Sequence, residues 1–157
     1  MTPQLEQRLR ETYAPLFRKV RRAGCGVAPI EARGCECGGG WYDLLGTLCE
    51  LLMWPYDQVR DYGDNSDPAK AFAAIERERK RLPALLQIKE KMGTLRVHFH
   101  AGDRRVRDLV GFEEQHSSKV CERCGAPGTL RTDGWMRVKC DACENRDRVK
   151  VVPLCET

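Results

Sequence analysis

The chain has 157 residues and a formal net charge of +4, a length that suits one domain with or without a small metal-binding module. No apolar run approaches the roughly 18 residues of a transmembrane helix, and the polar N-terminus lacks a signal-peptide hydrophobic region. We therefore expect a cytoplasmic protein without a membrane partner. Its nine cysteines cannot all pair within one chain, which favours metal binding over disulfides.

The charge is distributed unevenly along the chain. Residues 24–69 carry two basic and eight acidic groups, whereas residues 70–107 carry eleven basic and four acidic groups. A phosphate-binding surface is therefore expected on residues 70–107, with the first helix as a further contributor.

The N-terminal half shows helical patterns. Thr2 followed by Pro3 is typical of a helix start, and we predict a helix over residues 2–23. A loop rich in glycine and cysteine follows over 24–40. Leucines at helical spacing then predict a second helix over 41–53, which we expect Pro55 to end. An acidic loop is expected after it.

Asp67 and Pro68 indicate a third helix over residues 67–82, with a basic run near its end. The apolar period then becomes two, which predicts a β-hairpin over 86–100. A fourth helix is predicted over 104–118. We expect one apolar layer in which the second helix packs on the hairpin; its members are Trp41, Leu44, Leu45, Leu48, Leu95, Val97 and Phe99.

The strongest motif is a pair of Cys-x-x-Cys sequences, in which fifteen residues separate Cys124 from Cys140. The spacing predicts a zinc site formed by Cys121, Cys124, Cys140 and Cys143. Four thiolates leave no open coordination position, so the zinc is expected to stabilise structure. Leu130, Trp135 and Val138 are expected to cover the site, and residues 149–155 to add a final strand.

The predicted fold is therefore α+β. A helical N-terminal part packs on a β-hairpin in residues 1–118, and a zinc ribbon forms residues 119–157. A second metal site at Cys35, Cys37, His98 and His100 is an open alternative, because His98 and His100 share one strand face. The same four residues are where we would place an enzyme site, although no catalytic motif is found and the protein is expected not to be an enzyme.

Several segments together resemble a family of small bacteriophage and prophage proteins over roughly residues 34–143. They read Gly40-Trp41-Tyr42-Asp43-Leu44-Leu45, Lys89-Glu90-Lys91-Met92-Gly93-Thr94-Leu95-Arg96, Cys121-Glu122-Arg123-Cys124-Gly125-Ala126-Pro127-Gly128 and Gly134-Trp135. In that family the last metal ligand is often histidine, where this chain has Cys143. The resemblance implies a phage origin and action inside a bacterial host, and it carries no catalytic assignment.

These features predict a protein that acts by stoichiometric binding. The first hypothesis is an inhibitor of a host defence or nucleic-acid-handling complex, similar to anti-CRISPR proteins, in which acidic residues imitate phosphates toward a basic groove. The acidic candidates are Asp57, Asp61, Asp64 and Asp67. The second hypothesis is a nucleic-acid-binding protein, whose candidates are Arg77, Arg79, Lys80, Arg81, Lys89, Lys91 and Arg96.

Overall fold

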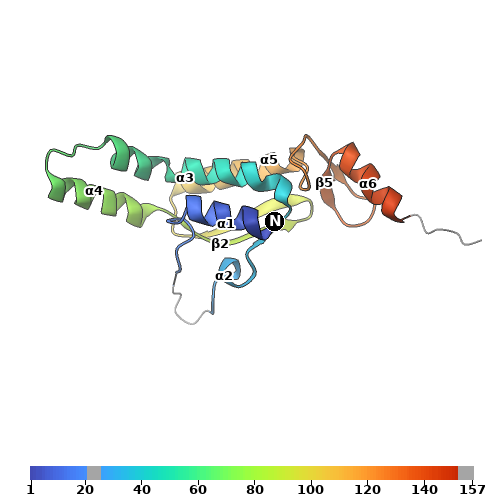
Figure 1. Ribbon diagram of the computed structural model, residues 1–157, viewed down its shortest axis with the longest axis horizontal. Helices are drawn as coiled ribbons and strands as arrows, with labels where there is room; N and C mark the ends of the chain where they lie inside the picture. The colour runs from blue at the N-terminus through green and yellow to red at the C-terminus, as the bar shows by residue number, and fades with distance from the viewer. Residues whose placement is uncertain (21–25, 152–157) are drawn as a thin grey trace, which may run out of the picture.

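The computed structural model describes residues 1–20 and 26–151, and it confirms an α+β fold (Figure 1). The helices are α1 (Pro3–Thr12), α2 (Pro29–Arg33), α3 (Tyr42–Tyr62), α4 (Pro68–Arg81), α5 (Arg104–His116) and α6 (Asp141–Val151), with 3-10 turns η1 (Gly39–Trp41) and η2 (Ser117–Lys119). The strands are β1 (Cys35–Glu36), β2 (Ala84–Lys91), β3 (Thr94–His100), β4 (Thr129–Arg131) and β5 (Arg137–Lys139).

The main sheet has the order β1-β2-β3, in which β1 runs parallel to β2 and β3 runs antiparallel to it. The predicted hairpin is confirmed. Its turn consists of Met92 and Gly93, with φ of 53° and 79°. Two successive positive φ values match the right-handed twist of the strands. Strand β1 was not predicted, because it is too short to give a periodic signal.

The predicted helix over residues 2–23 is wrong in its extent. Thr2 caps α1 as expected, with its hydroxyl accepting from Leu5 N at 3.3 Å. The helix ends at Thr12, because Pro15 has no N–H to continue it and disfavours helical backbone in the residue before it. Residues 21–23 lie outside the part of the chain that the structure describes.

The second helix is longer than predicted, because Pro55 lies inside α3 rather than at its end. A proline cannot donate to the carbonyl four residues earlier, which here is the carbonyl of Leu51. The guanidinium of Arg105 on α5 donates to that carbonyl instead. The tertiary contact thereby removes part of the cost of the proline, and α3 continues to Tyr62 through the segment expected to be an acidic loop.

The last turns of α3 and all of α4 form a helical hairpin that projects beyond the sheet (Figure 1). We call residues 54–81 the arm. No residue of the arm is buried. Asp67 caps α4, as predicted, by accepting from Ala69 N at 3.1 Å and from Lys70 N at 3.2 Å.

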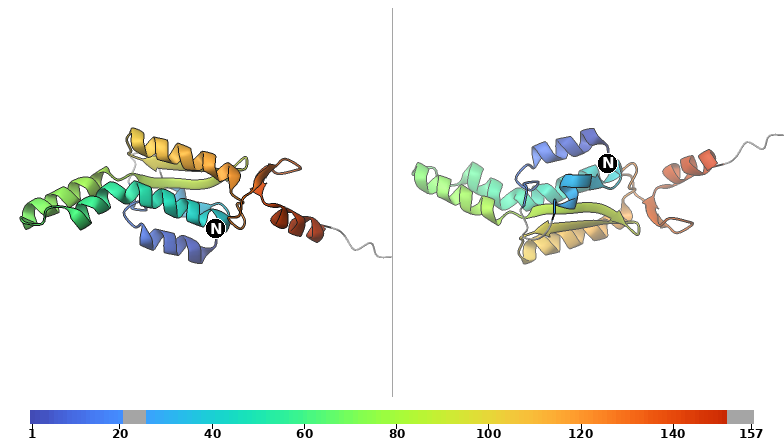
Figure 2. Two further views of the ribbon diagram at one scale, coloured as in Figure 1. Left: turned by 90° about the horizontal axis from the view of Figure 1, so that it is seen from above. Right: turned by 90° about the horizontal axis from the view of Figure 1, so that it is seen from below.

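The hydrophobic core contains the predicted layer. Trp41, Leu45 and Leu95 are fully buried in one cluster, while Phe99 is partly buried and packs against that cluster. Helix α5 lies along β3 (Figure 2). One polar side chain of α5 and one of the following turn η2 bond to the outer edge of this strand. Glu114 accepts from Val97 N at 2.9 Å and Ser117 Oγ accepts from Leu95 N at 2.8 Å, so the edge strand is not left unpaired there.

The C-terminal module contains the two-stranded hairpin β4–β5 followed by α6. The predicted final strand over residues 149–155 is wrong in its described part, because α6 extends to Val151. Residues 152–155 lie outside the described chain. None of the helices in the described ranges is long and apolar enough to cross a membrane.

Candidate metal centre

Two short segments supply the four cysteines. Cys121 and Cys124 flank a tight turn in which Gly125 N donates to the Cys121 carbonyl at 2.9 Å. Gly125 has φ of 80°, a conformation that costs glycine least. Cys140 directly precedes α6 and Cys143 lies in its first turn, where Cys143 N donates to the Cys140 carbonyl at 3.2 Å.

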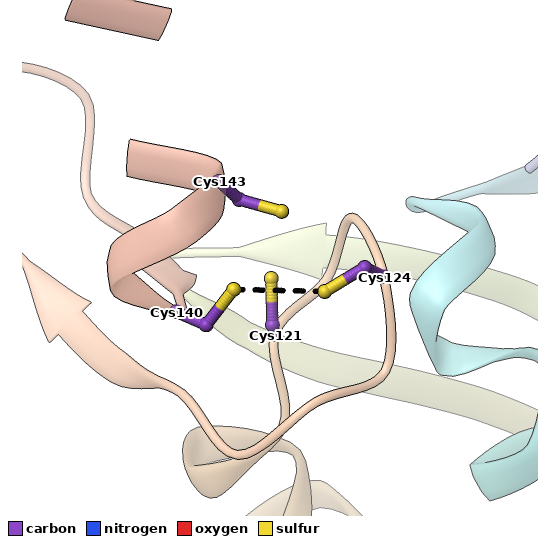
Figure 3. Close-up of side chains that lie close together, drawn as sticks. All are labelled: Cys121, Cys124, Cys140 and Cys143. Atoms are coloured by element: carbon purple, nitrogen blue, oxygen red, sulfur yellow. Dashed lines mark hydrogen bonds between the residues drawn. The ribbon is translucent and has the colours of Figure 1, made fainter. Parts of the chain in front are cut away.

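The four side chains converge on one space (Figure 3). The Sγ atoms of Cys121, Cys124, Cys140 and Cys143 all lie within 4.8 Å of one another, and they could hold a metal ion. Cys124 and Cys140 have Sγ atoms 3.6 Å apart, and none of the four cysteines forms a disulfide. Cys121 and Cys143 are buried, whereas Cys124 is exposed. The spacing of the two motifs therefore predicted the cluster correctly.

The surroundings of Cys121 and Cys143 favour negative charge on sulfur. Burial raises the pKa of the Cys121 thiol, but backbone N–H groups of Cys140, Cys124 and Arg123 outweigh it and lower that pKa to about 7. The guanidinium Nη2 of Arg146 lies 2.9 Å from Cys143 Sγ. Positive charge and N–H donors beside a thiol stabilise the thiolate, the form that binds metals. At Cys124 the backbone N–H of Ala126 lowers the pKa of the thiol, but hydrogen bonds to the other three cysteines and burial raise that pKa to about 12.

A buried lysine supports the module behind the cysteines. Lys139 is 7% exposed, and its ammonium contacts Asp147 and lies 3.6 Å from Glu144. Asp147 also pairs with Arg123, which lies in the Cys121–Cys124 turn. These ion pairs join α6 to β5 and to the turn, so both cysteine segments are fixed to one another by more than the metal.

The segment Gly38–Trp41 attaches the module to the rest of the protein. Gly38 N donates to Glu122 Oε1 at 2.7 Å, and Gly40 N donates to the Glu122 carbonyl at 2.8 Å. A Cβ on Gly40 would lie 2.3 Å from the Cys121 carbonyl oxygen, so the close approach requires glycine. Sequence reasoning missed this role, although three consecutive glycines before a tryptophan are a signal for close backbone contact.

The predicted cover of the cluster is wrong in part. Val138 is fully buried, but Leu130 is 45% exposed and Trp135 is 72% exposed. Trp135 lies in the connection between β4 and β5, beyond the paired residues, and therefore points away from the protein interior rather than over the sulfur atoms.

The alternative metal site at Cys35, Cys37, His98 and His100 does not form among the residues that the structure describes. Cys35 is aligned with Ile88 and, through it, with Val97, so these three side chains share the buried face of the sheet. His98 follows Val97 and therefore lies on the opposite face, where it is exposed. Burial raises the pKa of Cys35 and of Cys37 to about 12, which disfavours the thiolate form that binds metals.

Of the residues predicted to bind a partner, all except Lys89, Lys91 and Arg96 lie on the arm, and most of those on the arm already pair with a neighbour there. Arg60 contacts both Asp57, at 2.9 Å, and Asp61, at 2.7 Å. Asp64 accepts from Ser66 N at 2.9 Å. Among the basic residues, Arg77 and Arg81 both pair with Glu78. Arg79 pairs with Glu76, whereas no ion pair is found for Lys80 among the described residues.

Comparison with models of protein families, with curated proteins and with solved structures gives no match to this chain. The resemblance to phage proteins stays a prediction.

Proposed function

We propose that this protein acts by stoichiometric binding to a macromolecular partner, and that a Zn²⁺ ion at the four cysteines stabilises its C-terminal module. Four thiolates are a typical donor set for structural zinc. Tetrahedral thiolates about 2.3 Å from Zn²⁺ would be about 3.8 Å apart. The 3.6 Å between the Sγ atoms of Cys124 and Cys140 is close to this value. Such a centre offers no position for substrate or water, so the proposed protein is not a zinc enzyme.

The observation that carries the proposal is that the arm contains no buried residue. Helices in proteins gain most of their stability by burying an apolar face, yet α4 has no buried residue. Three aromatic side chains of the arm are strongly exposed: Trp54 at 59%, Tyr62 at 80% and Phe72 at 68%. Exposed aromatic residues on a projecting helical hairpin are typical of a surface that a protein partner covers.

The charged residues of the arm are expected to contribute less affinity than its aromatic residues. Asp57 and Asp61 share Arg60, so a basic partner would have to compete with an existing ion pair. Exposed ion pairs contribute little free energy, and buried aromatic residues dominate most interfaces. The charges are then expected to affect the association rate and the choice of partner more than the affinity.

The identity of the partner follows from the resemblance to phage proteins and stays a prediction. We propose a host protein or nucleoprotein complex in the bacterial cytoplasm, with inhibition of a defence or nucleic-acid-handling complex as the outcome. Inhibition of this kind requires one inhibitor per target and no turnover.

The test compares the wild-type protein with the double variant Trp54→Ala/Phe72→Ala in capture from a bacterial lysate. Phe112→Ala is the matched control, because Phe112 is 63% exposed but lies on α5. We expect one partner that the wild type and Phe112→Ala retain and the arm variant loses. The purified complex should show a fixed stoichiometry by light scattering, and inhibition should be complete at that ratio. Inhibition by amounts of this protein far below those of its target would show turnover and contradict the proposal. Equal capture of the partner by the arm variant would also contradict it.

A further inference from the structure

The face of the main sheet that points away from the core carries several basic side chains. In the β2–β3 register Lys89 lies opposite Arg96, Gln87 lies opposite His98, and Lys91 lies opposite Thr94. These side chains lie on the face opposite the buried row of Ile88 and Val97. In the view from below, the strands lie in front of α3 and α5, and α2, which contacts β2, lies beside the strands on this side (Figure 2, right).

The cations of this face differ from most of those on the arm, because no carboxylate pairs with them in the part of the chain that the structure describes. Within the described residues, no ion pair joins Lys89, Lys91 or Arg96 to an acidic group, and Arg96 donates instead to Thr94 Oγ1 and the Leu95 carbonyl. Glu36 is adjacent to Lys89 in the register, but it pairs with Arg33 at 3.1 Å. Like charges directly opposite one another destabilise a sheet, and an anionic ligand would remove that cost.

The positive face continues onto the metal-binding module. The Met92–Gly93 turn contacts the β4–β5 hairpin so closely that a Cβ on Gly93 would lie 2.5 Å from Leu130 Cδ1 and 3.4 Å from Arg137 Cα. The backbone of Arg137 thus lies beside this turn, and its Nε donates to the Trp135 carbonyl at 3.4 Å. Burial raises the pKa of the Glu122 carboxyl, and the Arg137 guanidinium acts on that carboxylate to lower its pKa. Trp135, 72% exposed, stands two residues before Arg137 in the connection between β4 and β5.

We propose that this surface binds single-stranded nucleic acid. The phosphates would contact Lys89, Lys91, Arg96 and Arg137, and one base would stack on Trp135. A row of cations with an exposed aromatic side chain at its end is the combination that single-strand-binding proteins use, because every unpaired base offers a flat face. The polar character of Gln87, Thr94 and His98 disfavours an apolar protein partner on this face. The proposal does not rest on the function proposed for the arm.

The test measures binding of the metal-loaded full-length protein to a fluorescein-labelled oligothymidylate by anisotropy, at several salt concentrations. Three to four phosphate contacts to a single strand predict a slope of log Kobs against log salt of about −2 to −3. Lys89→Gln/Arg96→Gln should weaken binding at least about tenfold and reduce the slope by about 1.4. Lys80→Gln/Arg81→Gln on the arm removes the same charge and should leave both quantities unchanged.

Trp135→Ala tests the stacking contact separately. It should weaken binding about tenfold without changing the salt slope, whereas Trp54→Ala on the arm should have no effect. Circular dichroism and metal content confirm that each variant is folded. Absence of binding at low salt, or an unchanged slope in Lys89→Gln/Arg96→Gln, would overturn the proposal. Equally tight binding to polyglutamate, or to a duplex of the same length, would assign the surface to an acidic protein or to double-stranded nucleic acid instead.

Discussion

Arg105 donates a hydrogen bond to the backbone carbonyl of Leu51, the group that Pro55 leaves without its helical donor. The contact joins α5 to α3 at the one proline inside that helix, where the arm begins. It explains how a residue that ordinarily interrupts a helix is tolerated. It also suggests that the direction of the arm depends on a side chain from another element.

This relationship predicts coupling between the two residues. Arg105→Met should lower the free energy of unfolding by about 1–2 kcal/mol, because a hydrogen bond to a charged group is lost. In a Pro55→Ala background the backbone N–H returns, and the same change should cost clearly less. A double-mutant cycle from urea unfolding curves measures the difference. Equal costs in both backgrounds would show that Arg105 does not compensate for the proline.

Trp41 is expected to hold the metal-binding module against the main sheet. It is fully buried, and its Nε1 donates to the Val120 carbonyl at 2.9 Å. Trp41→Phe keeps most of the apolar contact but leaves that carbonyl unpaired, so the free energy of unfolding should fall by about 1–3 kcal/mol. Hydrogen exchange should also become faster in the residues around Val120. Trp54→Phe, at an exposed tryptophan, is the control and should change neither measurement.

Cys140→Ser is expected to release the metal and unfold the C-terminal module, because metal binding in such sites is coupled to folding. Elemental analysis of protein purified without chelator should show one zinc per wild-type chain and none in the variant. Cys49→Ser is the matched control, because Cys49 is buried in the main core, and it should retain the metal. A metal-free wild-type protein that keeps its C-terminal structure would contradict the proposed role.

The depth of burial along β3 predicts which truncation in this strand lowers the free energy of unfolding most. Leu95 is fully buried, and Leu95→Ala should cost about 2–5 kcal/mol. Phe99 is only partly buried at the end of the strand. Phe99→Ala should therefore cost less than the 3–5 kcal/mol typical of a fully buried phenylalanine. Denaturant unfolding curves of both variants measure which of the two loses more stability. A larger cost for Phe99→Ala would place the centre of the core nearer the α5 end of the hairpin.

The three buried cysteines of the main domain are expected to resist alkylation. Burial raises the pKa of Cys35 and of Cys37 to about 12, and raises that of Cys49 as well. At about pH 8 only about one Cys35 thiol in ten thousand would be ionised, and the thiolate is the nucleophile. Iodoacetamide labelling read by mass spectrometry should modify these residues only after denaturation. Labelling of any of these three residues before denaturation would contradict the prediction.

The sequence by itself determined those features that depend on residues close together in the chain. Two Cys-x-x-Cys motifs at fixed spacing predicted the metal centre, because each motif forms its own turn. Thr2 and Asp67 predicted helix starts, since a capping side chain reaches only the next few backbone N–H groups. Alternating apolar residues predicted the β2–β3 hairpin for the same reason: the period of a strand is a local property.

Only the tertiary structure decided the features that depend on contacts between distant segments. The length of α3 depends on Arg105, fifty residues beyond Pro55. The pairing of β1 with β2 placed Cys35 and His98 on opposite faces and so excluded the second metal site that their residue types suggested. Trp135 is exposed, and among the described residues Lys89, Lys91 and Arg96 have no acidic partner. Both facts depend on which elements pack beside these side chains. Local sequence fixes neither, since packing partners are chosen by long-range burial of apolar surface.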